Sequence, residues 1–266
     1  MLCLLALFCW VAPVRGEPTI IRIALTPEGS HQYFHELLKA AFLAAGHPVE
    51  LQGIVGPGKE RFKMMLRTGE LDVMWLVRGA ERDQLYVPVE FRLTDGLIGQ
   101  RILLIRPGEQ HRFDQIDSLD DFARLGLRAG MGKDWLDVGI WRQNGMPETS
   151  EVPEWRRLFK MLSAGNRAVD YIPRGLSEIQ IDANANPELA VEQRLLLRYH
   201  RDSIFYLTPS AGHLAPILLR GLQRIRANGR YAALLDKHFG HLKQAIGTDR
   251  RLVLDLTDND DPTPVR

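Results

Sequence analysis

Strand-like and helix-like segments alternate along this chain, and no other feature of the sequence restricts the possible folds as strongly. Thr19 to Leu25 is β-branched and apolar, which is typical of a buried strand. From Tyr33 to Phe42, apolar residues recur at steps of three and four, as on one face of a helix. Two further strand-like segments, 49–55 and 71–77, enclose a second helical segment. Because such alternation favours parallel sheets flanked by helices, we predict an α/β fold.

The alternation is interrupted once and then resumes. An irregular, aromatic stretch follows residue 82, after which Gln100 to Arg106 forms a long predicted strand that ends at Pro107. Short predicted strands and helices then alternate as far as 203–207, and two predicted helices and an apolar segment at Leu252 complete the pattern. A chain of 266 residues can form one large lobe or two modest ones. Length alone leaves the number of lobes open.

The first sixteen residues have the character of a secretory signal. An apolar run from Leu2 to Ala12 precedes Pro13 and a small residue at Gly16, although no Lys or Arg precedes the run. The alternative is a buried N-terminal strand. We expect this segment to be removed and the remaining protein to act in the periplasm. Both cysteines, Cys3 and Cys9, lie within it, so the mature chain would have no disulfide and no cysteine metal ligand.

Charge and motifs exclude several classes of function. Without Arg15, the chain has 33 Lys and Arg and 33 Asp and Glu, a balance that gives no reason to expect a nucleic-acid partner. His31 and His35 have a spacing that can bind zinc, but no third ligand is identifiable and the H-E-x-x-H motif is absent. The nucleophile-elbow and phosphate-loop motifs are also absent. We therefore predict a protein without a metal, a cofactor or an enzymatic activity.

The order of elements and a set of short motifs resemble the extracellular solute-binding protein family 3, whose members are the periplasmic binding proteins of amino-acid-type ABC importers. The motifs that carry the resemblance are Gly69-Glu70-Leu71-Asp72, Glu81-Arg82, Arg106-Pro107-Gly108, Ser118-Leu119-Asp120-Asp121-Phe122, Ala164-Gly165 with Val169-Asp170, Asn228-Gly229-Arg230-Tyr231 and His238-Phe239-Gly240. The resemblance implies the two-lobed type II fold of periplasmic binding proteins. Each lobe would be a mainly parallel sheet flanked by helices.

The resemblance also implies how the chain is divided. After the signal segment 1–16, the first lobe would consist of 17–105 and 206–250, and the second lobe of 106–205. Two crossing strands near Leu103 and Phe205 would form the hinge on which the lobes close around a ligand. Residues 251–266 would form a C-terminal tail, in which a short apolar strand candidate at Leu252 is followed by an acidic segment from Asp258 to Arg266 that we expect to be mobile. We expect a monomer whose partners are a small-molecule ligand and either an ABC transporter permease or a membrane sensor protein.

Two predicted ligand contacts come from matches to family positions. Arg82 matches the arginine that holds the ligand carboxylate, a role suited to a planar, permanently charged group. Its alternative is a surface arginine paired with Glu81 or Asp83. Arg128, Gly130 and Gly132 match the loop whose backbone amides bind the same carboxylate. The alternative for that loop is a plain turn between a strand and a helix.

Arg174 marks the largest departure from the family pattern. Relatives that bind α-amino acids have an aspartate in this region to neutralise the ammonium group, whereas this chain has Pro173, Arg174 and Gly175. An ammonium beside Arg174 would be repelled by roughly 1 to 4 kcal/mol, so we expect an anionic or neutral polar ligand. The alternative for Arg174 is an ion pair with Glu178, four residues further on.

Four aromatic residues complete the predicted site together with two charged ones. Tyr33, Trp75, Trp135 and Tyr171 lie near predicted strand ends or loop edges, where a cleft could use them to stack on a ligand. Core packing is the alternative for each. Glu28 and Arg78, at the ends of two predicted strands, are also predicted contacts. The leading hypothesis is a periplasmic solute-binding protein, and the alternatives are an enzyme on the same fold and a ligand-free interaction protein.

Overall fold

The computed structural model describes residues 18–25, 32–56, 58–133, 135–147, 150–165 and 169–259. The predicted signal segment 1–16, the predicted contact Glu28 and His31 lie outside these residues, as do residues 260–266 of the predicted tail. Within the described part of the chain, none of the helices combines the length and apolar character needed to cross a bilayer.

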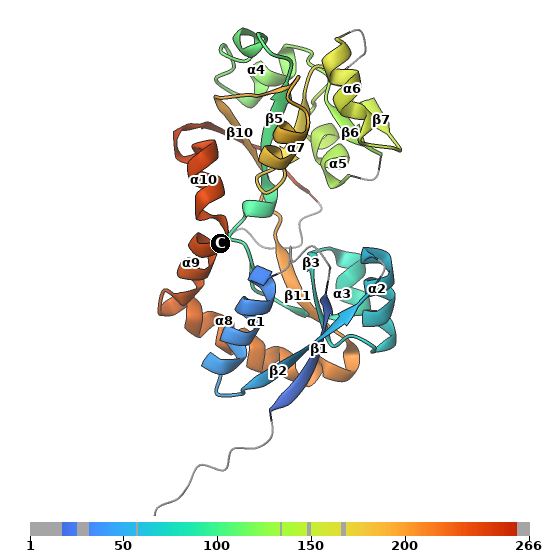
Figure 1. Ribbon diagram of the computed structural model, residues 1–266, viewed down its shortest axis with the longest axis vertical. Coiled ribbons are helices and arrows are strands. Elements are labelled where there is room, and N and C mark those ends of the chain that lie inside the picture. The colour runs from blue at the N-terminus through green and yellow to red at the C-terminus, as the bar shows by residue number, and fades with distance from the viewer. Residues whose placement is uncertain are drawn as a thin grey trace, which may run out of the picture.

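The first of two sheets contains β1 (Thr19–Leu25), β2 (Val49–Val55), β3 (Val73–Val77), β4 (Val87–Val89) and β11 (Ser203–Leu207). Its order is β2-β1-β3-β11-β4. β1 is parallel to β2 and β3, as the alternation predicted, whereas β11 is antiparallel to both β3 and β4. This sheet and the helices around it are called the first lobe (Figure 1).

β3 is apolar at every position, so both faces of the first sheet must be shielded from water, and helices cover both. Val73 and Trp75 belong to the core shared with α1 (Gln32–Ala44) and α8 (Ala215–Ala227). Met74 and Leu76, which point the other way, belong to the core that includes α2 (Lys59–Thr68). α3 (Ala80–Leu85) follows β3, and the short η3 (Pro209–Leu214) precedes α8.

Close contact between α1 and α8 requires a glycine. A Cβ atom at Gly221 would lie 1.9 Å from the carbonyl oxygen of Ala41 on α1. The backbones of α1 and α8 are therefore in direct contact at this point, and a side chain at position 221 would push the two helices apart.

The second sheet contains β5 (Gln100–Ile105), β8 (Ile172–Gly175), β9 (Ala190–Val191), β10 (Leu195–Arg198) and β12 (Leu252–Asp255). β5 is antiparallel to β8, β9 and β10, so this sheet is more antiparallel than the alternation predicted. β12 lies parallel to β10. Our predicted boundaries assigned 100–105 to the first lobe and 251–266 to a tail, whereas the structure places β5 and β12 in this second sheet.

Helices and a two-stranded sheet surround the second sheet and complete the second lobe (Figure 1). The small sheet pairs β6 (Gly130–Gly132) in parallel with β7 (Ser150–Val152). The helices are η2 (Gln110–Arg112), α4 (Leu119–Arg124), α5 (Leu136–Gln143), α6 (Arg157–Ala164) and α7 (Ile179–Ala185).

Two segments cross between the lobes, and a backbone hydrogen bond joins them. One contains η1 (Leu97–Gly99) and leads into β5, and the other joins β10 to β11. The backbone N–H of Tyr199 donates to the carbonyl oxygen of Gly99 at 3.1 Å. A Cβ at Gly99 would lie 1.9 Å from the carbonyl oxygen of Tyr199, so the crossing leaves no room for a side chain there.

The C-terminal part of the chain crosses between the lobes as well. From the first lobe, α9 (Arg230–Leu235), the π-helix η4 (Asp236–Gly240) and α10 (His241–Ile246) extend along one side of the molecule (Figure 1). The short η5 (Thr248–Arg250) then leads into β12 of the second sheet.

Candidate functional site in the interlobe cleft

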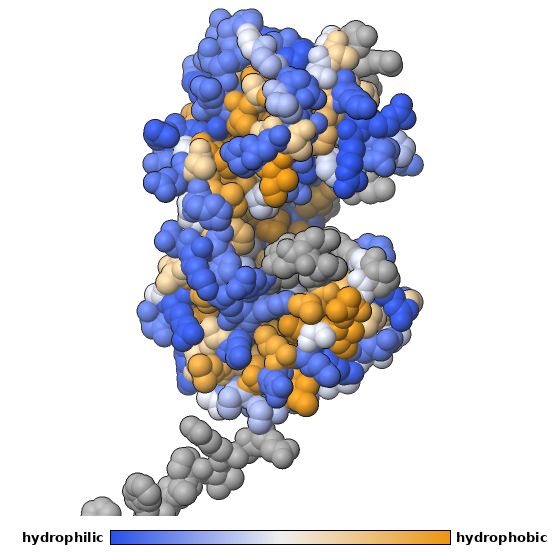
Figure 2. Space-filling view, in the orientation of Figure 1, coloured by the Kyte–Doolittle hydropathy of each residue, from blue (hydrophilic) through white to orange (hydrophobic). Residues whose placement is uncertain are grey.

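Two adjoining cavities lie between the lobes, and Figure 2 shows the molecule hollowed at this level. The first, called the apolar cavity, has a volume of about 360 Å³ and is lined largely by Phe34, Leu97, Ile98, Leu176 and Phe239. The second, called the aromatic cavity, has a volume of about 320 Å³ and is lined by residues that include Trp135, Trp155 and Arg174. Both cavities contact Ile98, Arg101 and Glu178.

The wall of the aromatic cavity is a stack of aromatic rings and a guanidinium group. Cζ of Arg174 lies 4.8 Å from the ring centroid of Trp135 and 4.8 Å from that of Trp155. Such contacts between a cation and aromatic rings stabilise the charge and hold the guanidinium plane in place. Beneath Trp135 lies Gly132, where a Cβ would come within 2.4 Å of the indole Nε1. The glycine is therefore required by the stack, and Trp155, which was not among the predicted contacts, also lines the cavity.

Two carboxylates compensate the charge of Arg174. Its Nε donates to Oδ2 of Asp182 at 2.5 Å, and its Nη2 lies 3.4 Å from Oε2 of Glu178. The alternative that we gave for Arg174, pairing with Glu178, is confirmed. Because the guanidinium is buried and already has negative partners, it offers less attraction to an anionic ligand than the sequence suggested.

A second paired arginine forms the floor that both cavities share. Nε of Arg101 donates to Oδ1 of Asp137 at 2.5 Å, and its Nη1 donates to the carbonyl oxygen of Ile98 at 2.6 Å. Nη2 of Arg101 donates to the hydroxyl of Tyr199, which itself donates to Oδ1 of Asp137 at 3.2 Å. These contacts join β5, α5 and a crossing segment at one point.

The protonation of this cluster is set by burial and by its own charges. Burial opposes the charge of Arg101, but its neighbours, chiefly the carboxylate of Asp137, together outweigh burial and raise the pKa of Arg101 above its ordinary value. Burial also raises the pKa of Tyr199, so the phenol stays neutral. Sequence reasoning missed all three residues, although an arginine inside the otherwise apolar strand QRILLIR was a signal.

Glu178 is the most accessible charged group shared by the two cavities. Its side chain is 52% exposed, whereas the side chains of Arg101 and Asp137 are 13% and 8% exposed. One carboxylate oxygen accepts from the backbone N–H of Gly175 at 3.1 Å. We considered Glu178 only as a partner of Arg174, and its place just beyond a strand end was the available signal.

The predicted arginines of the first lobe lie beside the cleft. Arg78 makes ion pairs with Glu90 at 2.7 Å and Asp83 at 3.2 Å. Burial opposes its charge, but the two carboxylates prevail and raise the pKa of Arg78. Nη1 of Arg82 donates to the carbonyl oxygen of Val77 at 2.7 Å, and Val77 lines the aromatic cavity. Ligand contact for Arg78 and Arg82 stays a prediction.

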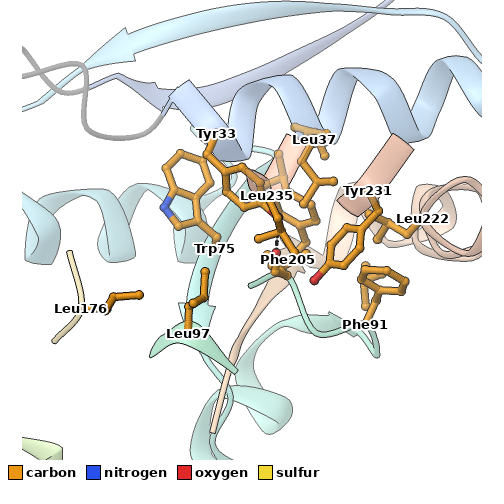
Figure 3. Packing of buried hydrophobic residues seen from close by; sticks show 14 of the residues in the cluster. Tyr33, Leu37, Trp75, Phe91, Leu97, Leu176, Phe205, Leu222, Tyr231 and Leu235 are labelled. Atoms are coloured by element: carbon orange, nitrogen blue, oxygen red, sulfur yellow. Dashed lines mark hydrogen bonds between the residues drawn. The ribbon is translucent and has the colours of Figure 1, made fainter. Parts of the chain in front are cut away.

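Tyr33 and Trp75 lie one layer behind the apolar cavity. Tyr33 is buried and its hydroxyl donates to the carbonyl oxygen of Leu93. Trp75 is buried as well and stacks on Phe34, with ring centroids 4.9 Å apart and planes 9° apart. Figure 3 shows Trp75 above Leu97, toward which Leu176 of the second lobe points. The described contacts of Tyr33 and Trp75 are those of core packing, which was the alternative for both.

Arg128, Gly130 and Tyr171 lie in the second lobe, away from the lining of the two cavities. Arg128 is exposed, and its backbone N–H donates to Oδ2 of Asp170 at 2.9 Å. A Cβ at Gly130 would lie 2.8 Å from Val169, so this glycine serves close packing. The hydroxyl of the fully buried Tyr171 accepts from Nε1 of Trp141 at 2.8 Å. Of the predicted contacts that the structure describes, Trp135 and Arg174 are brought together in the cleft.

Among the described residues, no group of three or more His, Cys, Asp or Glu side chains comes together in a way that could hold a metal ion. The charged side chains in the cleft instead form arginine–carboxylate pairs. The arrangement can bind a small molecule between two lobes through stacked rings, apolar side chains and one accessible carboxylate.

Neither a protein-family model nor a curated protein matches this sequence. Solved structures do match. The chain is similar to a probable amino-acid ABC transporter extracellular-binding protein from Bacillus subtilis, with a TM-score of 0.63 and 12% identity over 84% of this chain and 99% of that one.

Two further solved structures have ligands in their descriptions. An amino acid ABC transporter substrate-binding protein from Streptococcus pneumoniae, bound to L-arginine, has a TM-score of 0.53 and 16% identity over 84% of this chain and 95% of that one. The GluR0 ligand-binding core from Nostoc punctiforme, in complex with L-glutamate, has a TM-score of 0.50 and 16% identity over 84% and 99%. The protein therefore has the two-lobed α/β fold of the type II periplasmic binding proteins, as the sequence predicted.

Proposed function

We propose that this protein is an exported solute-binding protein, which captures a small polar molecule between its lobes and releases it unchanged. The observation that supports this proposal most directly is the pair of connected cavities between the lobes, with stacked rings, apolar side chains and the carboxylate of Glu178 around them. Binding sites for small molecules are commonly concave and mostly apolar, with a few polar groups in fixed positions. The solved neighbours from S. pneumoniae and N. punctiforme hold an amino acid.

The pairing of the cleft arginines changes the expected charge of the ligand. Arg101 and Arg174 face three carboxylates, Asp137, Asp182 and Glu178, so the cluster keeps one excess negative charge, and Glu178, although it contacts Arg174, is its most exposed carboxylate. An anion placed against that carboxylate would be repelled, and a group that donates hydrogen bonds or carries positive charge would be attracted, by about 1 to 4 kcal/mol at contact. We therefore propose a neutral or cationic polar ligand rather than an anionic one.

A ligand screen tests this function. The purified protein would be heated with a panel of amino acids, amines, sugars and carboxylates, and a solute-binding protein should show a raised melting temperature with a few related compounds. Mass spectrometry of molecules released by gentle denaturation would identify a copurified ligand. If the panel and the released fraction contain no binder, the proposed function is wrong. If the bound molecule is converted on prolonged incubation, the protein is an enzyme instead.

The proposed partner is either an ABC transporter permease or a membrane sensor protein, with the binding protein itself a monomer. Light scattering of the purified protein would measure its mass in solution. Uptake of the identified ligand would be measured in cells with and without the protein. If the partner is an ABC transporter permease, uptake should fall when the protein is absent; if the partner is a membrane sensor, uptake should not change.

A further inference from the structure

One residue that lines the apolar cavity, Phe239, comes from a segment that connects the two lobes. This segment, residues 230–259, is called here the C-terminal strap; it contains α9, η4, α10 and β12 and lies on one side of the molecule (Figure 1). Phe239 of the strap lines the apolar cavity together with Phe34 of α1 and Leu176 of the second lobe. With the segment 94–101, which contributes Leu97 and Ile98, four parts of the chain that are far apart in sequence line the cavity.

The strap is fixed to the first lobe just before Phe239. The carboxylate of Glu36 on α1 accepts from Nζ of Lys237 at 2.7 Å and lies 3.2 Å from Nε2 of His238. The hydroxyl of Tyr231 donates to the carbonyl oxygen of Arg92 at 3.0 Å. The ring of Phe239 meets that of Tyr33 edge to face, with centroids 5.0 Å apart. These contacts hold the strap beside the cavity.

The strap is also fixed to the second lobe. β12 pairs with β10, and beyond it Asp258 forms a buried ion pair, with distances of 2.5 and 2.8 Å, with Arg201 of the segment that crosses from β10 to β11. Asn144 and Thr257 exchange hydrogen bonds of 2.7 and 2.8 Å. Each end of the strap is therefore attached to a different lobe, and any rotation of the lobes must be taken up between these attachments.

Between these attachments the strap contains two helical elements, η4 and α10, that are weakly buried. α10 has no buried residue, and the five residues before it form the π-helix η4. A π-helix is rare, is wider than an α-helix and is frequent at functional sites. Here it is the element that carries Phe239 to the cavity. The weakly packed α10 and the widened turn are the places where the strap can adjust.

We propose that Phe239 is a specificity-determining residue, which selects ligands with an apolar group that fills the apolar cavity while their polar group reaches Glu178. This inference rests on the proposed function and adds the chemical class of the ligand, a small amphipathic molecule with a hydrogen-bond-donating end. Glu178 lines both cavities, so one molecule can contact Phe239 and Glu178 together. Burial of each additional methylene group should raise the affinity about fourfold until the cavity is full.

Two series of probes test the inference. The straight-chain primary amines from ethylamine to hexylamine and the straight-chain amino acids from alanine to norleucine share a donating end and differ in apolar length. Calorimetry or melting shifts should show affinity rising along at least one series with the wild-type protein. In Phe239→Ala, which enlarges the cavity, the preferred length should increase and the probe preferred by the wild type should bind about tenfold more weakly.

Leu234→Ala is the matched control, because Leu234 is a partly buried apolar residue of the same strap that does not line the cavity. It should lower the melting temperature without changing the order of preference among the probes. An unchanged order in Phe239→Ala, or an equal change in Leu234→Ala, overturns the inference. If the wild type binds compounds of the wider panel but neither series, the inference is wrong and the proposed function stands. If nothing in the panel binds, both are wrong.

Discussion

The two lobes hold their walls of the cleft in place by different means. In the first lobe, the rings of Phe34 and Trp75 stack on each other above a sheet that has helices on both faces. In the second lobe, Arg174 and Arg101 are held by carboxylates that come from other elements. An apolar wall depends on shape, whereas a wall of paired charges depends on every partner being present, because a buried charge without its partner is costly. The second lobe should therefore respond more sharply to single substitutions.

The buried pair between Arg201 and Asp258 should give the largest effect. Their side chains are 7% and 2% exposed, so Asp258→Ala removes a carboxylate that contacts a buried guanidinium, and the free energy of unfolding should fall by several kcal/mol, up to about 5 kcal/mol. Urea denaturation would measure the change. The control is Asp255→Ala, which breaks the Arg198–Asp255 pair with side chains 39% and 54% exposed, and should cost at most about 1 kcal/mol. Equal losses would show that burial does not set the cost of breaking a charge pair.

A single methyl group added at Gly132 should disturb the stack in the aromatic cavity. In Gly132→Ala the new Cβ meets the ring of Trp135, so the stack must shift, at a cost of about 1 to 3 kcal/mol in the free energy of unfolding and with weaker ligand binding. Gly139→Ala on α5 is the matched control, since a Cβ there has nothing within 4 Å. It should stabilise the protein by about 0.5 to 1 kcal/mol because alanine favours a helix. Thermal and chemical denaturation would separate the two outcomes.

The first lobe was the easier one to predict from the sequence. Its elements from β1 to α3 follow one another in the chain, and the periodicity within them shows which face is buried, as Tyr33, Leu37 and Leu38 do on α1. In the second lobe, β12 pairs with β10, which lies far upstream. Periodicity describes one segment at a time and contains no information about such a pairing.

The same limit explains why the candidate site was predicted only in part. Arg174 was singled out from the sequence and lines the aromatic cavity, but the two indoles beside it come from positions 135 and 155, in separate segments. Phe239 was part of a motif that we used only to recognise the fold. The cleft depends on contacts between segments that lie far apart in the chain, and the sequence alone did not show which would meet.

Glu178 tests whether the second lobe contributes an accessible charge as well as paired ones. In Glu178→Gln the shape is kept and the charge is lost, so affinity for a ligand with a donating or positive group should fall about fivefold, equivalent to about 1 kcal/mol. Glu70→Gln is the control, because Glu70 is 50% exposed and lies 3.8 Å from Arg61, outside the lining of the cavities. Calorimetry with the identified ligand would measure both. Stronger binding in Glu178→Gln would instead indicate an anionic ligand.

Loss of the contact between Glu36 and the strap should have the smallest effect on stability. It tests how much a partly exposed charge pair of the first lobe contributes. The hydrogen bond from Lys237, with a smaller contribution from His238, lowers the pKa of Glu36 from 4.5 to about 2. Because the folded-state pKa is the lower one, the stabilisation is present above pH 4.5 and is lost as the pH falls toward 2. Glu36→Gln should remove this part of the pH dependence, at a cost at neutral pH of less than about 1 kcal/mol, since the pair is partly exposed. Urea denaturation of both proteins across this pH range would measure the difference, and parallel curves would show that the contact adds no stability.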